Sequence, residues 1–230
     1  MCINGGVAYF CSDRDRHGTT KIQINGNMDS DEELVDSSIF IPSKSYRLLS
    51  RKLANEKKFI DNTIFSQNMF GLDTNYIGKA GDISVKTSRG ITDSIVKGDI
   101  KKGVEYINKY KVITGSMNTT SIINKPEILD TKTICTRTYT ILGIYETYES
   151  ADIVKKYFMT KFVRALIDLT LNNQMVSHDN YKYIPLQDFT SSSDIDWSQS
   201  IADIDKQLYK KYNLSEEEIA YIEKTIKPMN

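Results

Sequence analysis

The sequence predicts a mixed α/β domain in which a curved sheet of short strands packs against helices. Between residues 62 and 131, short runs of β-branched residues alternate with stretches rich in Gly, Asn, Thr and Ser, which is typical of small strands joined by long loops. Residues 133–144 are dense in Thr, Ile and Tyr, which fit a pleated surface, so we expect a central strand there. After Ser150, apolar residues recur at helical spacing and predict a long helix packed on the sheet.

The first fifty residues predict a hairpin, a strand and a helix. A charged turn over residues 13–18 separates two strand-like runs, Val7–Phe10 and Thr19–Ile24. Residues 37–41 read as a short strand that ends at Pro42. Ser43 then caps a predicted helix whose apolar positions are Tyr46, Leu49 and Leu53.

The remaining elements follow from periodicity and from capping residues. Short strands are expected at Ile83–Val85, Ser94–Val96, Val104–Ile107 and Lys111–Ile113. Ser150 is the expected N-cap of the long helix, whose apolar stripe comprises Val154, Tyr157, Phe158, Phe162, Ala165, Leu166 and Leu169. A Ser-rich stretch at 190–194 leads to two C-terminal helices, the second opened by a capping box at Ser215–Glu218. We therefore expect two units, residues 1–189 and a helical extension of residues 190–230.

The composition describes a folded protein without a general attraction for polyanions. Apolar residues make up 40% of the chain, and 30 basic residues balance 30 acidic ones, so a nucleic-acid site has to come from local clustering. Between Lys79 and Lys111 there are eight basic residues against four acidic ones. This excess favours a basic stripe, although a solvated face gives the same pattern.

The sequence offers no pattern of residues that predicts catalysis. His17 and His178 have no cysteine or carboxylate at metal-ligand spacing, and Cys2, Cys11 and Cys135 are interpreted as structural thiols. Without a C-x-x-C pair, a signal peptide or a long apolar run, the chain is expected in the cytoplasm and not in a membrane. No glycine-rich loop predicts a cofactor site, so we expect no catalytic residue, cofactor or metal in this chain.

A magnesium-dependent nuclease remains an alternative. Such sites combine an acid with a carboxylate two residues before a lysine, and three segments fit that loose pattern: Glu56–Lys58, Asp99–Lys101 and Asp130–Lys132. Three matches are what chance supplies in a chain this rich in Lys and Asp. None of them follows a convincing hairpin that carries the partner acid.

Two polar loops have both a structural and a functional interpretation. Phe70–Tyr76 combines an aromatic-Gly turn with small polar residues, which suits DNA contact and equally suits a turn that satisfies its own backbone. Asn172–Gln174 follows the long helix, where amides commonly cap a C-terminus but also suit adenine recognition.

Several motifs spread along the chain are similar to those of one family. They are Gly5–Phe10 with Asp13–Asp15, Phe70–Tyr76, Ile134–Tyr139, Thr160–Arg164, Tyr183–Phe189, and Leu208–Tyr212 through Leu214–Ile219. Together they resemble the C-terminal part of type II restriction-modification adenine-specific DNA methyltransferases, and the chain is also similar to specificity domains of type I systems. The resemblance implies a target-recognition domain that selects a DNA sequence. A separate catalytic domain would bind S-adenosylmethionine and hold the flipped adenine.

Two departures limit what the resemblance transfers. The chain has Cys11–Ser12 where family members carry a bulky aromatic segment, and its central loops differ freely. Loops that read bases diverge while the scaffold persists, so the residues that read bases do not carry over.

Sequence-specific binding of double-stranded DNA is therefore the expected function, with the methyltransferase catalytic domain as a second partner. The predicted DNA contacts are Lys86, Arg89, Lys97, Lys101 and Lys111, with Arg137, Lys161 and Arg164 as secondary candidates. Besides the nuclease, a protein-interaction module remains an alternative, because a neutral chain with aromatic loops also suits protein partners.

Overall fold

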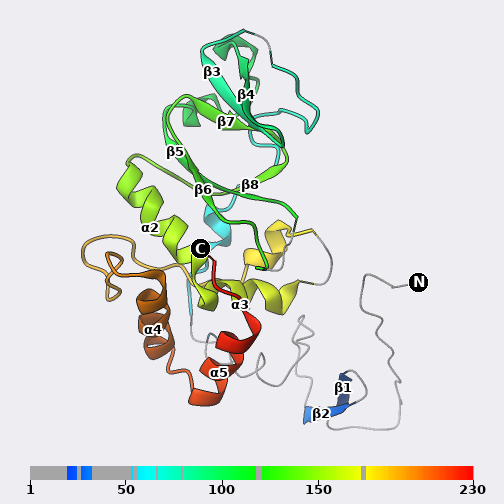
Figure 1. Ribbon diagram of the computed structural model, residues 1–230, viewed down its shortest axis with the longest axis vertical. Coiled ribbons are helices and arrows are strands. Elements are labelled where there is room, and N and C mark those ends of the chain that lie inside the picture. Colours follow the sequence, from blue (N-terminus) through cyan, green and yellow to red (C-terminus); the bar gives the residue numbers. More distant parts are fainter. Residues whose placement is uncertain are drawn as a thin grey trace.

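The computed structural model describes residues 20–24, 27–32, 53, 56–65, 67–78, 80–117, 121–171 and 175–229. The predicted mixed α/β class is confirmed. Figure 1 shows a small sheet at one end, a second sheet below it, and helices beneath both. β1 (Thr20–Ile24) pairs antiparallel with β2 (Asn27–Glu32). The predicted strand at Val7–Phe10, the strand at 37–41 and all of the helix from Ser43 except Leu53 lie outside the described residues.

The sheet nearer the helices, here called the inner sheet, has the order β6-β5-β8 and is antiparallel. It comprises β5 (Tyr110–Gly115), β6 (Glu127–Leu129) and β8 (Tyr139–Tyr145). Neighbouring side chains of β5 enter different cores: Val112 packs with the helices, and Ile113 packs with the second sheet. Because side chains alternate along a strand, the inner sheet is covered on both faces.

The second sheet, here called the outer sheet, has the order β4-β3-β7. β3 (Ile83–Thr87) forms a hairpin with β4 (Gly90–Ile95) and runs parallel to β7 (Thr133–Cys135). Its inward residues, Val85 and Ile134, are fully buried in a core separate from that of the helices. Two short 3-10 helices, η2 (Lys97–Asp99) and η3 (Val104–Tyr106), follow β4.

Two strand predictions need correction. Residues 133–144 do not form one central strand but β7 and β8, each at the edge of a different sheet. The chain turns between them, where Thr136 N donates to Lys86 O and Tyr139 N donates to Thr136 O. Residues 104–106 form η3 instead of a strand, because Gly103 takes a left-handed conformation (φ 67°) that starts a tight turn.

The long helix predicted after Ser150 is two helices, α2 (Tyr148–Met159) and α3 (Lys161–Thr170). The N-cap of α2 is Thr147, whose hydroxyl accepts from Ser150 N. Thr160 is extended (ψ 149°) and separates the helices, and its hydroxyl accepts from Val163 N to cap α3. The predicted apolar stripe is confirmed, since all of its members are buried.

Both predicted C-terminal helices are present, α4 (Ile201–Lys211) and α5 (Glu216–Thr225), and the capping box at Ser215 and Glu218 is confirmed. Ile204 and Ile222 belong to the same core as the α3 residues, and the rings of Phe162 and Tyr212 stack at 4.9 Å. The helices thus share one core, and a second core lies under the outer sheet. Within the described residues, no helix has the length and apolarity required to span a membrane.

Candidate nucleic-acid interface

The predicted cations fall into buried and accessible groups, and Lys111 belongs to the first. It is fully buried in β5, and its Nζ donates to Ile107 O at 2.8 Å. Burial lowers the pKa of this ammonium to about 8, although Cys135 and Asp130 oppose the shift. A side chain enclosed in this way cannot contact DNA in this fold, so Lys111 is removed from the predicted set.

Arg164 is the second buried cation. Its Nε donates to Thr160 O at 3.2 Å, and its Nη1 donates to Lys227 O at 2.7 Å and to Ser121 O at 3.3 Å. The guanidinium therefore ties α3 to the C-terminal segment and to the loop after β5. Arg164 is likewise removed from the predicted contacts, because its donors are used inside the protein.

Lys161 and Lys86 are held by ion pairs between elements. Lys161 pairs with Glu223 of α5, and only 14% of its side chain is exposed. Lys86 pairs with Glu127 at 2.7 Å, which links the outer sheet to the inner one. Both cations contribute to packing, and their charges are largely matched by these carboxylates.

Lys97, Lys101 and Lys102 are exposed in the loop that follows β4. Among the described residues, none forms a side-chain ion pair with these three lysines. The loop is held by packing, since the Lys102 stem lies beside Gly71 and the Phe70 ring lies against Gly103. Here we call residues 96–103 the basic loop.

The turn at Phe70–Tyr76 lies next to the basic loop, and much of it is structural. Phe70 and Leu72 are buried, Thr74 N donates to Asp73 Oδ1 at 2.6 Å, and Tyr76 N donates to Asp73 O at 3.0 Å. Arg137 N donates to Leu72 O at 2.9 Å, so the loop that carries Arg137 also lies here. The Arg137 guanidinium is half exposed and 4.0 Å from Asp73. Three loops thus meet around Gly71 and Leu72.

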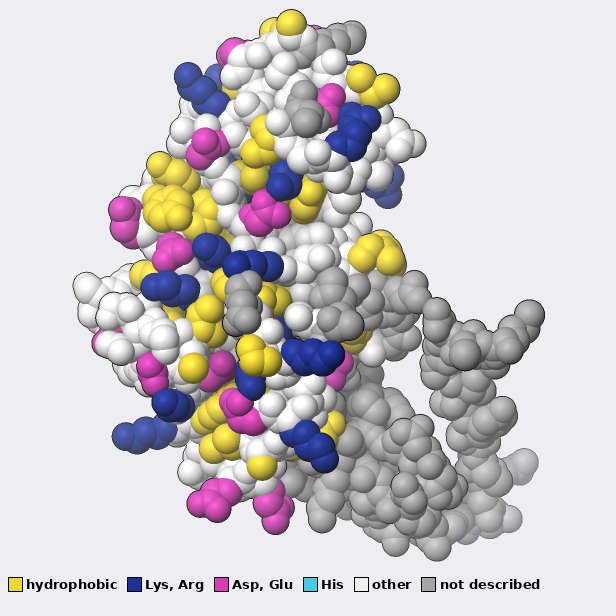
Figure 2. Space-filling view, in the orientation of Figure 1, with side chains coloured by type: hydrophobic (Ala, Val, Ile, Leu, Met, Phe, Trp, Pro, Cys, Tyr) yellow, Lys and Arg dark blue, Asp and Glu magenta, His cyan; other side chains and the backbone are white. Residues whose placement is uncertain are grey.

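Charge on this part of the molecule is mixed. Figure 2 shows Lys and Arg side chains around the outer sheet, with hydrophobic and acidic side chains between them. Isolated cations among apolar groups differ from the continuous basic stripe that the sequence predicts. Such a surface suits a few defined phosphate contacts together with contacts to base edges.

No described residues form a cluster of three or more His, Cys, Asp or Glu side chains suited to a metal ion. Cys135 is buried, and desolvation raises the pKa of its thiol to about 12, which disfavours the reactive thiolate and fits the structural role predicted for it. His178 Nε2 lies 3.1 Å from Asp61 O. Cys2, Cys11, His17 and Asn172–Gln174 lie outside the described residues.

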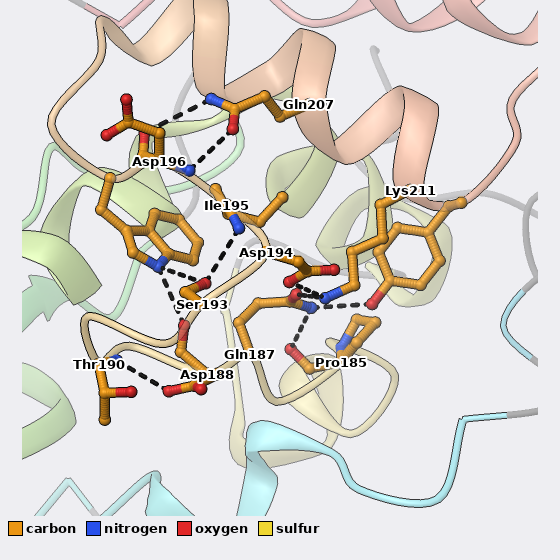
Figure 3. Close-up of polar contacts among 12 residues, drawn as sticks. Pro185, Gln187, Asp188, Thr190, Ser193, Asp194, Ile195, Asp196, Gln207 and Lys211 are labelled. Carbon is orange, nitrogen blue, oxygen red and sulfur yellow. Dashed lines mark hydrogen bonds and ion pairs between the residues drawn. The ribbon is translucent and has the colours of Figure 1, made fainter.

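A polar network that the sequence did not predict joins the segment around Pro185 to α4 (Figure 3). Gln187 Nε2 donates to Tyr212 Oη at 2.8 Å, and Lys211 Nζ donates to both Gln187 Oε1 and Asp194 Oδ1 at 2.8 Å. Tyr157 of α2 donates to Pro185 O at 2.7 Å. This network fixes Tyr183–Phe189 and Leu208–Tyr212 against each other.

The Ser-rich stretch at 190–194 is part of the same region and is folded. Thr190 N donates to Asp188 Oδ1 at 2.8 Å, and Ile195 N donates to Ser193 Oγ at 3.1 Å. The Trp197 indole N–H donates to Asp188 O at 3.0 Å and anchors the stretch to the helical core. Its Ser and Asp side chains close local turns.

Comparison with models of known protein families, with curated proteins and with solved structures gave no match to this chain.

Proposed function

We propose that this chain is a sequence-specific double-stranded DNA-binding module. It would serve as the target-recognition part of a type II restriction-modification adenine-N6 DNA methyltransferase. The catalytic part, which would bind S-adenosylmethionine, is expected in a separate domain. The proposal begins from the resemblance of motifs in this sequence to those of that enzyme class.

The observation that carries the proposal is the division of the fold into a scaffold and an accessible surface. Three of the motifs, Thr160–Arg164, Tyr183–Phe189 and Leu208–Tyr212, meet in the helical core through Asp205, Gln187 and Tyr212. The lysines of the basic loop lie on the outer sheet instead, away from this core. A rigid base that carries exposed, weakly paired cations on loops suits recognition of a varied ligand.

The chemistry of the exposed groups also favours DNA. Within the described residues, the lysines of the basic loop form no ion pair, so they can replace the counterions of backbone phosphates, which makes binding depend on salt. On the neighbouring loops, Arg137 and Asn75 are exposed and suit the acceptors and donors of base edges.

Selection from a random pool of duplexes tests this function. The purified chain is incubated with the pool at low salt, and bound duplexes are sequenced over several rounds. Enrichment of one short motif is the expected result, and recovery of a random pool would contradict the proposal. A parallel incubation with Mg²⁺ separates binding from nuclease activity, because binding leaves the duplexes intact.

A further inference from the structure

The turn of the β3–β4 hairpin carries an arginine that is both exposed and held in place. The Arg89 side chain is 55% exposed, and its Nη2 donates to Asp93 Oδ2 at 2.9 Å and to Tyr76 O at 3.1 Å. Its backbone N–H donates to the Thr87 hydroxyl at 3.2 Å, which fixes the turn itself. The guanidinium therefore loses little conformational entropy when it meets a further acceptor.

The carboxylate that holds Arg89 is itself fixed. Only 9% of the Asp93 side chain is exposed, and its Oδ1 accepts from Gly78 N at 2.6 Å. Gly78 lies so close to β4 that an added Cβ would be 2.5 Å from Ser94 N. The segment at Tyr76–Gly78 thus packs along β4 and positions Asp93 for the arginine.

The hairpin beneath the turn is rigid. β3 is the central strand of the outer sheet, paired with β4 on one side and with β7 on the other. Tyr139 Oη of the inner sheet donates to Thr87 O at 3.1 Å, at the last residue before the turn. β7 pairs with β3 as far as Lys86, so only the turn at residues 88–89 extends past the three-stranded sheet. This turn is the part that can reach base edges in the major groove of B-DNA.

The charge balance distinguishes a base contact from a phosphate contact. Asp93 carries a negative charge 2.9 Å from the guanidinium and would repel a phosphate that approached the pair. A base edge is neutral, so it can accept from the guanidinium without that penalty. Within the described residues, no acceptor is bonded to Nε or Nη1 of Arg89. These two groups lie on different edges of the guanidinium, so each can donate a single hydrogen bond to DNA while Nη2 stays bonded to Asp93 and Tyr76.

Two exposed aliphatic side chains lie close in sequence to the arginine and its partner. Ile91 is 55% exposed two residues after Arg89, and Ile77 is 73% exposed next to Tyr76. Large apolar side chains at a water-exposed surface suit contact with thymine methyl groups, which line the major groove. They would gain little from contact with phosphates.

We infer that Arg89 is a specificity-determining residue that donates to the N7 or O6 acceptor of a guanine when the β3–β4 turn reaches the major groove. The inference rests on the proposed function, because it names the residue and the base that the module reads. Asp93 is the positioning residue, and it acts through Arg89.

The test repeats the duplex selection with wild type and with Arg89→Lys, which keeps the charge but loses the planar guanidinium. Arg89→Lys is expected to bind random DNA as well as wild type within about twofold. At one base-pair position it should lose the preference for guanine by roughly 2- to 12-fold, the value of one hydrogen bond, with other positions unchanged. Lys101→Gln is the matched control, expected to weaken all sequences alike and to leave the motif intact.

Asp93→Asn gives an independent readout. Its amide keeps the volume of the side chain but is a weaker acceptor, so a partial loss at the same position is expected. If Arg89→Lys and wild type select the same motif at every position, the inference about Arg89 is overturned while the proposed function stands. If wild type itself selects no motif, the proposed function fails and the inference fails with it.

Discussion

Asp205 of α4 accepts a hydrogen bond from the backbone N–H of Phe162, the second residue of α3, at 2.9 Å. Its other oxygen accepts from Lys161 N at the same distance. A carboxylate from a distant helix thus caps α3, in addition to the local cap from Thr160. Asp205 is 3% exposed, and burial raises its pKa to about 6, against the opposing effect of these two hydrogen bonds.

Replacing Asp205 by Asn is expected to remove a pH dependence of stability. The pKa of Asp205 is higher in the folded state than in the unfolded chain, so its contribution is fully present below about pH 4 and is lost as the pH rises through 6. The free energy of unfolding of wild type should therefore fall by about 3 kcal/mol relative to Asp205→Asn between pH 4 and 7. Urea unfolding at several pH values measures the difference.

Asp203, on the same helix as Asp205, provides a control because its pKa is shifted in the opposite direction. It is exposed, and its pKa is lowered by hydrogen bonds from Lys206 and Ser200. Stability from Asp203 is therefore present at neutral pH and is lost on acidification. A variant Asp203→Asn with the same pH profile as Asp205→Asn would contradict the assignment.

Lys111→Met is expected to stabilise the protein near neutral pH. Burial lowers the pKa of Lys111 to about 8, so the folded state is penalised for holding a charged ammonium below that pH. The free energy of unfolding should rise by about 2 kcal/mol at pH 7, since loss of the hydrogen bond to Ile107 O offsets part of the relieved penalty. This gain should shrink as the pH rises from about 8 to 10.5. Thermal and urea melts across this range measure it. A large destabilisation at pH 7 would show that the buried amine is required.

Gly81→Ala is expected to destabilise the outer sheet. A Cβ at this position would lie 2.1 Å from the backbone carbon of Ile95, so β4 would have to shift, at roughly 1–3 kcal/mol. Gly98→Ala is the matched control, because a Cβ there meets nothing within 4 Å and the change should be neutral within about 0.5 kcal/mol. Equal unfolding free energies for the two variants would mean that the contact at Ile95 is not tight.

Local patterns in the sequence were sufficient for much of the scaffold. The 3.6-residue spacing from Val154 to Leu169 predicts the buried stripe, and Ser215 with Glu218 predicts the start of α5. The break at Thr160 was missed because the apolar spacing continues across it. A threonine three residues before Val163 is the signal that could have indicated a second cap.

Predictions of individual contacts were weaker, because counting charges ignores burial. Lys111 adjoins Val112 and Ile113 in a buried strand, and Arg164 lies within the apolar stripe of α3. Both neighbourhoods indicate burial. The excess of cations between Lys79 and Lys111 favours exposure of Lys111 alone, and Arg164 was only a secondary candidate. The support of Arg89 by Asp93 and Tyr76 depends on strand pairing and packing, which no local pattern reveals.

The salt dependence of DNA binding tests most directly whether the outer sheet is the DNA-facing surface. Dissociation constants for one duplex are measured by fluorescence anisotropy between about 50 and 200 mM salt. Over this range of salt the affinity is expected to change by roughly tenfold or more. Wild type is compared with two triple variants that each remove three exposed lysines. The first is Lys97→Gln/Lys101→Gln/Lys102→Gln in the basic loop, and the second, the control, is Lys206→Gln/Lys210→Gln/Lys224→Gln on α4 and α5. We predict that the slope of log affinity against log salt falls by about 2–3 in the first variant and is unchanged in the second, because the outer sheet faces the DNA. Equal slopes for the first variant and wild type, or a loss confined to the α4 and α5 variant, would contradict it.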